Sequence, residues 1–286
     1  MEHILIADAG STKVDWAAVE TTGKVALRFS TPGLNALMAS QSDVEKALAG
    51  VMETLGSEIR PARTYYYGAG CATPEICDKM RSSLLANLGG EEAFVTTDLL
   101  GAARATLGKR KGIACILGTG SNSCFYDGKE IVTNVPSLGF ILGDEGSGAA
   151  LGKRLVSDAF KGHLPEAVKE KFLDAYKLTL GEILDKIYRQ PSPNRFLASL
   201  VPFLKENIWN PYVYSLVLKE FTQFFRRNVS RYKGVHSLPI SVTGSLATNF
   251  ENILREAAAS QGFSLSVITA TPLDGLITFH TEPTDE

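Results

Sequence analysis

The stretch His3–Lys13, HILIADAGSTK, decides the fold assignment, because a short apolar run ends there in a turn of small residues. His3–Ala7 is typical of a buried strand. In the turn Asp8–Lys13, glycine lets the backbone approach a ligand closely, and successive backbone N–H groups form an anion-binding nest. We interpret this turn as a candidate phosphate site, against the simpler alternative of an ordinary hairpin, which glycine and serine also favour.

A second turn of the same kind follows the apolar run Ile113–Leu117. Gly118-Thr119-Gly120-Ser121 again combines small residues with hydroxyl groups. For one turn alone the hairpin would be the better interpretation. Two turns at matching positions, each after a buried strand, favour phosphate binding instead. Facing each other across a cleft, such turns would hold the β- and γ-phosphates of a nucleotide.

The order of elements repeats along the chain. Val14–Glu20 and Lys24–Ser30 alternate as strands after the first turn, and each half then continues with alternating helices and strands. A chain of 286 residues exceeds the usual size of one hydrophobic core. We therefore predict domains at 1–108 and 109–286, the second with a helical insertion around 155–235.

Helix starts can be assigned from capping residues. Ser42 and Glu45 fit a capping box, and Thr73 precedes a proline at a first helical turn. Asp98 lies between a predicted strand, Phe94–Thr97, and a predicted helix. From the local sequence alone, its carboxylate could serve as a plain helix cap.

Two further segments carry candidate ligand groups. Gly143–Gly148, GDEGSG, holds two adjacent acids at a helix start, where they could serve as caps. Three glycines are more than a cap needs, and a carboxylate there could accept hydrogen bonds from sugar hydroxyls. Gly244–Ala247 follows the strand Ile240–Thr243 and is either a turn that packs on a nucleoside or a simple strand-helix junction.

The bulk composition narrows the class of protein. With a net charge of −2, the chain has no basic field to bind nucleic acid or an anionic membrane. Its four cysteines form no CxxC pair, so we expect reduced, mostly buried thiols. The N-terminal apolar run is too short for a signal peptide, and we expect a cytoplasmic protein. A P-loop, a dinucleotide fingerprint and a GxSxG elbow are absent from the sequence.

Taken in order, the motifs resemble those of the superfamily of sugar kinases, heat-shock chaperones and actin. Asp8–Lys13 is similar to its first phosphate loop, Leu117–Ser121 to its second, and Val242–Ala247 to its adenosine motif. Gly143–Ser147 indicates the branch shared by N-acetylglucosamine kinases and activators of 2-hydroxyacyl-CoA dehydratases. The resemblance spans nearly the whole chain. It implies an α/β fold of two actin-like (ribonuclease H-like) domains, each a mixed five-stranded sheet flanked by helices, with a nucleotide cleft between them.

The resemblance also implies an ATP-dependent kinase that uses Mg²⁺ and phosphorylates an amino sugar, with N-acetylglucosamine 6-phosphate as the expected product. Asp98 matches the family's catalytic base, and Asp8 the residue that would help to hold Mg²⁺. The residues implied for nucleotide binding are Asp8, Gly10, Ser11, Thr12, Lys13, Gly118, Thr119, Gly120, Ser121, Gly244, Ser245 and Thr248. Those implied for sugar binding are Asn35, Asn122, Ser137, Leu138, Gly139 and Asp144. Leu138 departs from the family pattern, in which a tryptophan is expected.

Two other functions stay open. A dehydratase activator would need thiolates for an iron–sulfur cluster, here two per subunit, whereas Cys115 and Cys124 lie where packing is the better interpretation. A sugar sensor would usually carry a DNA-binding helix-turn-helix, whereas this chain begins directly at its first strand. The oligomeric state is also open, a homodimer included, since Trp209–Tyr214 could be an apolar docking surface or core.

Overall fold

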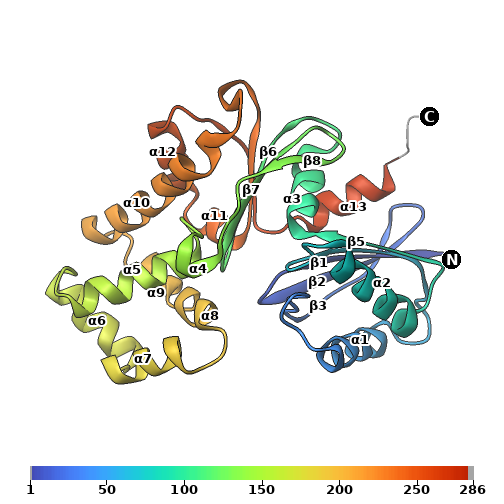
Figure 1. Cartoon of the computed structure of the whole chain (residues 1–286), viewed down its shortest axis with the longest axis horizontal. Coiled ribbons are helices and arrows are strands. Elements are labelled where there is room, and N and C mark those ends of the chain that lie inside the picture. Colours follow the sequence, from blue (N-terminus) through green and yellow to red (C-terminus); the bar gives the residue numbers. More distant parts are fainter. Residues whose placement is uncertain (1, 283–286) are drawn as a thin grey trace. The chain divides into compact units, whose positions relative to one another are not determined.

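The computed structural model describes residues 2–282 and divides them into two compact units. Unit 1 holds the residues up to 110, 126–131 and those from 271 on, and unit 2 holds 111–125 and 132–270. Each unit contains one five-stranded sheet flanked by helices (Figure 1), which confirms the predicted fold class. Within the described residues, no helix is both long and apolar enough to cross a membrane.

The sheet of unit 1 has the strand order β3-β2-β1-β4-β5. Its strands are β1 (His3–Ala9), β2 (Lys13–Glu20), β3 (Val25–Pro32), β4 (Pro61–Gly68) and β5 (Glu92–Thr97). β1 pairs antiparallel with β2 but parallel with β4, and β4 pairs parallel with β5, so the sheet is mixed. Ala9 pairs with Gly68, and Gly68 pairs with Thr97. The carboxyl ends of β1, β4 and β5 therefore meet at one edge.

Helices cover both faces of this sheet. α1 (Gln41–Leu55) and α2 (Pro74–Leu88) share a core with Leu5 and Ala7 of β1. On the opposite face α13 (Leu273–Thr281) packs on Ile4 and Ile6, beside α3 (Asp98–Leu107). Figure 1 shows the two helix pairs on opposite sides of the sheet. Because both faces are buried, β1 is a continuous apolar run rather than an alternating one.

The start of α1 differs from the sequence prediction, whereas the start of α2 agrees with it. The N-cap of α1 is Ser40, whose hydroxyl accepts from the backbone N–H of Asp43 at 3.2 Å, and not Ser42. The Asp43 carboxylate accepts from the Ser40 N–H in return at 3.1 Å. A capping box two residues earlier satisfies the N–H groups of Ser40 and Asp43 and adds half a turn of helix. Thr73 caps α2 as predicted, with Pro74 in its first turn.

The sheet of unit 2 has the order β10-β9-β6-β7-β8. Its strands are β6 (Gly112–Leu117), β7 (Ser121–Tyr126), β8 (Ile131–Asn134), β9 (Ile240–Thr243) and β10 (Leu265–Thr269). β9 pairs parallel with both β6 and β10. The strand pair β6-β7 thus holds its turn at a position equivalent to the β1-β2 turn of unit 1.

Helices make up most of the rest of unit 2. They are α4 (Gly139–Leu142), α5 (Gly148–Phe160), α6 (Glu166–Tyr176), α7 (Leu180–Tyr188), α8 (Pro193–Ala198), α9 (Val201–Glu206), α10 (Pro211–Arg227), α11 (Ser245–Asn249) and α12 (Glu251–Ser260), with short 3₁₀ helices η1 (Val229–Arg231) and η2 (Val235–Ser237). The domain division at residues 108 and 109, and the insertion around 155–235, stay predictions. The packing of α13 with unit 1 was not anticipated from the sequence.

His280 fastens α13 to the sheet of unit 1. Its Nε2 lies 2.7 Å from the Tyr67 hydroxyl, and its ring stacks on Tyr65 with centroids 3.7 Å apart. Burial, and then the nearby Arg104 guanidinium, lower the pKa of His280 from 6.5 to about 4. The folded protein therefore requires a neutral imidazole here.

We predict that His280 makes folding stability fall as the pH drops from 6.5 towards 4. In that window the unfolded chain takes up a proton that the folded state cannot, which removes at most ~1.4 kcal/mol per pH unit. His280→Gln keeps an acceptor for Tyr67 but does not titrate. Guanidinium unfolding at pH 7 and pH 5 should therefore show a smaller loss for His280→Gln than for wild type, and equal losses would contradict the assignment.

Candidate functional site

The first phosphate-type turn joins β1 to β2 in unit 1. The Gly10 N–H donates to the Lys13 carbonyl at 2.9 Å and closes the turn. Gly33 supports it from the end of β3, because its N–H donates to the Thr12 carbonyl at 3.0 Å. A Cβ at Gly33 would collide with the backbone of Ser11 and Thr12. The turn therefore depends on a glycine outside it.

Asn35 lies directly beside this turn. Its amide Nδ2 donates to the Ser11 hydroxyl at 3.3 Å, and its Oδ1 accepts from the Leu37 N–H at 3.1 Å. The Ala36 N–H donates to the Ala69 carbonyl at 3.0 Å, and the Ala69 N–H donates to Ala9 at 2.7 Å. The loop that carries Asn35 is thus tied by hydrogen bonds to the end of β1.

Asp8 lies near the end of β1 with its carboxyl deep among protein atoms. Burial, and then the charges of Asp98 and Asp15, raise the pKa of Asp8 to about 7. The Thr271 hydroxyl donates to Asp8 Oδ2 at 3.4 Å. Lys13 Nζ lies 2.8 Å from Asp15 Oδ2, so the ammonium group partly neutralises the negative charge of Asp15.

Asp98 is the first residue of α3, directly after β5. Its N-cap is Thr97, whose hydroxyl accepts from the Leu100 N–H at 3.2 Å. Asp98 Oδ1 accepts only locally, from the Leu99 N–H at 2.9 Å, and burial raises the pKa of Asp98 to about 6. Thr97, and not Asp98, is therefore the N-cap of α3. The Asp98 residue lies at the same edge of the sheet as Asp8.

The second turn, Gly118–Ser121, joins β6 to β7 in unit 2. Gly148 and Ala149 at the start of α5 donate their N–H groups to the carbonyls of Gly118 and Thr119, at 2.8 and 3.1 Å. The Ser121 hydroxyl donates to the Glu145 carbonyl at 2.8 Å. The turn is thus fixed from outside by the segment that precedes α5.

The two acids of that segment have different environments. Asp144 is buried, has φ of 57°, and accepts from the Ser121 N–H at 3.3 Å. Burial raises its pKa to about 6. Glu145 instead forms an ion pair with Arg227 at 2.9 Å and accepts from Asn228 at 3.2 Å. Glu145 therefore anchors the loop to the end of α10, while Asp144 is held in a strained backbone conformation beside the turn.

The remaining predicted sugar residues are spread over unit 2. The Asp144 N–H donates to the Ser137 carbonyl at 3.0 Å, which joins the ends of the loop containing Leu138 and Gly139. Leu138 has φ of 61° and is 64% exposed. Asn122 lies in β7, where its Oδ1 accepts from the Asn134 side chain at 2.9 Å.

Gly244 forms the β9-α11 junction. It has φ of 124°, and a Cβ there would collide with the Leu117 carbonyl at the end of β6. A cavity of about 400 Å³ is lined by Thr119 of the second turn together with Ser245 of α11. The structure thus brings the second turn and the start of the predicted adenosine motif to one cavity of unit 2.

Thr248 does not line this cavity, and its hydroxyl donates to the Ser245 carbonyl at 3.1 Å. Lys205 and Asn249 do line it, although neither was singled out from the sequence. Lys205 comes from the helices between α5 and α10, which carry no recognisable motif. Asn249 is the last residue of α11, and an asparagine at that position does not by itself predict a binding role.

Similarity to solved structures covers the whole chain. A protein described as a "putative N-acetylglucosamine kinase" from Porphyromonas gingivalis is 43% identical, over 97% of this chain and 98% of that one, with a TM-score of 0.94. The chain belongs to the N-acetylglucosamine kinase family.

More distant structures share the fold of this kinase family. A protein of the same description from Chromobacterium violaceum is 18% identical over 98% of this chain and 99% of that one, with a TM-score of 0.77. A ROK family glucokinase from Streptomyces griseus, in complex with glucose and AMPPNP, is 12% identical over 97% and 98%, with a TM-score of 0.57. At these identities the likeness concerns the fold alone. No family model and no curated protein matches the chain.

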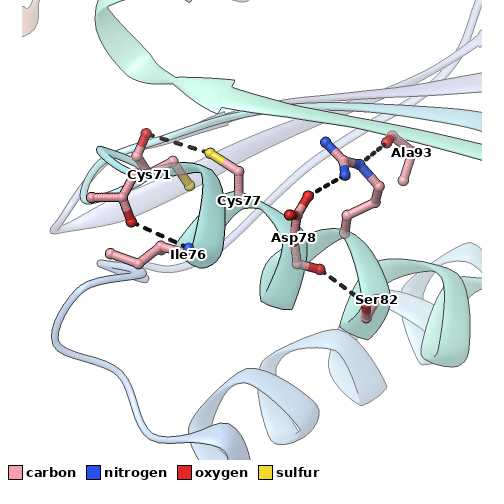
Figure 2. Close-up of polar contacts among 8 residues, drawn as sticks. Cys71, Ile76, Cys77, Asp78, Ser82 and Ala93 are labelled. Atoms are coloured by element: carbon pink, nitrogen blue, oxygen red, sulfur yellow. Dashed lines mark hydrogen bonds and ion pairs between the residues drawn. The ribbon is translucent and has the colours of Figure 1, made fainter.

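The four cysteines of this family member are free thiols, and three of them are buried. Figure 2 shows Cys77, in the first turns of α2, directed at the Cys71 carbonyl, with Sγ and O 3.6 Å apart. Burial raises the pKa of Cys71 and of Cys124 to about 12, and the pKa of Cys77 and Cys115 also lies above its usual value. Without a metal, all four thiols are therefore predominantly protonated at neutral pH.

We predict that Gly33→Ala impairs nucleotide binding by displacing the first turn. The added methyl group would meet the backbone of Ser11 and Thr12, which cannot move without opening the turn. We expect a loss of ~1–3 kcal/mol in unfolding free energy and a higher KM for ATP.

Gly50→Ala is the matched control. Gly50 lies inside α1 with open space around the Cβ position, so this change should stabilise the helix by ~0.5–1 kcal/mol and leave the KM for ATP unchanged. Equal effects of the two substitutions on urea unfolding and on KM would contradict the role assigned to Gly33.

Proposed function

We propose that the protein is an ATP-dependent sugar kinase that converts N-acetylglucosamine to N-acetylglucosamine 6-phosphate. The observation that carries this proposal is the Asp98 carboxyl, which lies at the same strand edge as Asp8 while Thr97 serves as the helix cap. The 43% identity to a family member over nearly the full chain supports the same reaction class.

In this proposal ATP binds through the second turn and the β9-α11 junction of unit 2. The backbone N–H groups of Gly118–Ser121 would donate to phosphate oxygens, as a nest of amides does for anions. The cavity lined by Thr119 and Ser245 supports this assignment, since one end of it is the turn and the other the predicted nucleoside motif. The turn Asp8–Lys13 of unit 1 is proposed as a second phosphate-binding turn on the strength of the family resemblance.

Asp8 has the chemistry expected of a Mg²⁺ ligand. Magnesium prefers oxygen ligands and is usually bound through one or two carboxylates. Burial, and then the charges of Asp98 and Asp15, raise the Asp8 pKa, and a divalent cation would offset that repulsion. When bound, the ion would neutralise charge on the phosphates of ATP.

Asp98 is the proposed general base. It would accept the proton of the sugar 6-hydroxyl while that oxygen bonds to the γ-phosphorus and ADP leaves with the electrons of the broken P–O bond. The pKa of Asp98, about 6, leaves the carboxyl ionised at neutral pH and gives it more basicity than an ordinary aspartate.

Asn35 and Asp144 are the proposed sugar-binding residues of their respective units. Both present side-chain oxygens on loops that hydrogen bonds hold beside a phosphate turn. Ser137, Leu138, Gly139 and Asn122 stay proposals for sugar contact on the strength of the family resemblance. The proposal places the protein in the cytoplasm with ATP and a sugar as its small-molecule partners.

We predict that Asp98→Asn lowers kcat by ~10²–10⁴-fold while the protein stays folded, because the amide cannot accept a proton. Sugar-dependent ADP release from Mg·ATP, measured with a panel of amino sugars, checks the prediction, and Asp78→Asn on the exposed surface of α2 serves as the control. Full activity in folded Asp98→Asn would remove the base assignment. No turnover with any sugar, in protein that still binds ATP, would leave the sensor function in place of the kinase.

A further inference from the structure

Two of the four cysteines come together where β4 leads into α2 in unit 1. Cys71 follows the carboxyl end of β4, and Cys77 lies in the first turns of α2. Cys77 Sγ is 3.6 Å from the Cys71 carbonyl oxygen, and the two thiols also share a hydrogen bond. Figure 2 shows their sulfur atoms side by side at the start of the helix. The fold therefore holds two free thiols in contact at this junction.

The two thiols differ in their access to solvent. Cys71 is 2% exposed, and its Sγ is so enclosed that a Cβ at Gly68 would lie 2.8 Å from it. Cys77 is only partly buried. Burial raises the pKa of Cys77, but the charge of Arg81, one turn further along α2, and the hydrogen bond with Cys71 lower it. A reagent in solution therefore reaches Cys77 first, and Cys71 is the neighbouring thiol that can react with it next.

The loop that carries Cys71 packs tightly against the loop that carries Asn35. Gly70 has φ of 83°, and a Cβ at this position would lie 2.3 Å from Asn35 Oδ1. The Ala36 N–H also donates to the Ala69 carbonyl at 3.0 Å. These contacts link the thiol pair to Asn35, so a displacement of Cys71 reaches the proposed sugar-binding residue through a single neighbouring glycine.

We propose that Cys71 and Cys77 are a modification site, at which a reversible disulfide forms and weakens sugar binding by displacing Asn35. The inference rests on the proposed role of Asn35 in sugar binding. A disulfide holds its sulfur atoms about 2.0 Å apart, which is closer than two free thiols can approach. Because Cys77 is fixed in a helix whereas Cys71 lies in a loop, the loop moves when the bond forms, and Asn35 moves with it.

The reaction needs an oxidant, for which a low-molecular-weight disulfide such as oxidised glutathione serves. The Cys77 thiolate attacks one sulfur of the oxidant, the S–S bond of the oxidant breaks, and one glutathione leaves as its thiolate. The Cys71 thiolate then attacks the Cys77 sulfur of the mixed disulfide and expels the second glutathione. The protein loses two electrons and two protons, and these convert oxidised glutathione into two molecules of thiol. Because thiols reverse both steps, the modification is transient in a reducing compartment.

Peptide mass mapping tests the disulfide directly, because trypsin leaves each pair of cysteines in a peptide of its own. Residues 64–79 contain Cys71 and Cys77, and residues 112–129 contain Cys115 and Cys124. Folded wild-type protein is treated with oxidised glutathione, then unfolded in iodoacetamide and digested. We expect peptide 64–79 to lose two hydrogen atoms in mass and to take up no iodoacetamide, whereas peptide 112–129 should be alkylated at both cysteines. Dithiothreitol, added before iodoacetamide, should restore alkylation of peptide 64–79.

Sugar kinetics give the second readout. The KM for N-acetylglucosamine should be about fivefold higher in oxidised than in reduced protein, which is the loss expected for one hydrogen bond to the sugar. The kcat should change little, because Asn35 would hold the ground state and the transition state alike. Cys77→Ser should keep the KM of the reduced protein and stop responding to oxidised glutathione. Cys124→Ala is the matched control, since it removes a buried thiol of unit 2 and should respond as wild type does.

The outcomes separate this inference from the kinase assignment. Alkylation of both cysteines in peptide 64–79 after exposure to oxidised glutathione, or a stable glutathione adduct at Cys77, would overturn the inference, as would a disulfide in peptide 112–129 alone. A disulfide in peptide 64–79 that leaves the KM for the sugar unchanged would overturn the coupling to Asn35. The same disulfide in protein that phosphorylates no sugar in its reduced state would support the modification site and remove the proposed function.

Discussion

Two partly buried acids at the carboxyl edge of parallel strands in unit 1 are the constraint on which the proposed chemistry depends. Asp8 and Asp98 follow from the pairing of β1 with β4 and of β4 with β5, which brings both strand ends to one edge. Burial raises the pKa of both carboxyls, and at Asp8 the charge of Asp98 adds to the rise. Raised carboxyl pKa values are frequent at functional sites, which is consistent with the proposed roles of Asp98 and Asp8.

Both glycine-rich turns are shaped by residues that lie outside them. In unit 1 the first turn rests on Gly33, and in unit 2 the second rests on the start of α5. Each turn therefore depends on hydrogen bonds from a segment more distant in the chain, Gly33 for the first turn and Gly148 for the second. This arrangement explains the different surroundings of Asp144 and Glu145, because one faces the turn and the other ties the loop to α10.

Much of the fold and part of the candidate site follow from local patterns. Apolar runs located the central strands, and Thr73-Pro74 located the start of α2, since these signals are contained in a few adjacent residues. The start of α1 is less well determined by local sequence. Ser42 is followed by Glu45 and Ser40 by Asp43, each three residues later, so both serines fit a capping box. The return of α13 to unit 1 and the position of Lys205 depend on long-range packing, which no local pattern encodes.

The most direct test of the central claim is proton-coupled ³¹P NMR of the product formed from Mg·ATP and N-acetylglucosamine. The account predicts a new phosphomonoester signal split by the methylene protons of C6, formed together with ADP and absent with Asp98→Asn. Release of inorganic phosphate without a sugar phosphate, or the same product from folded Asp98→Asn, would contradict it.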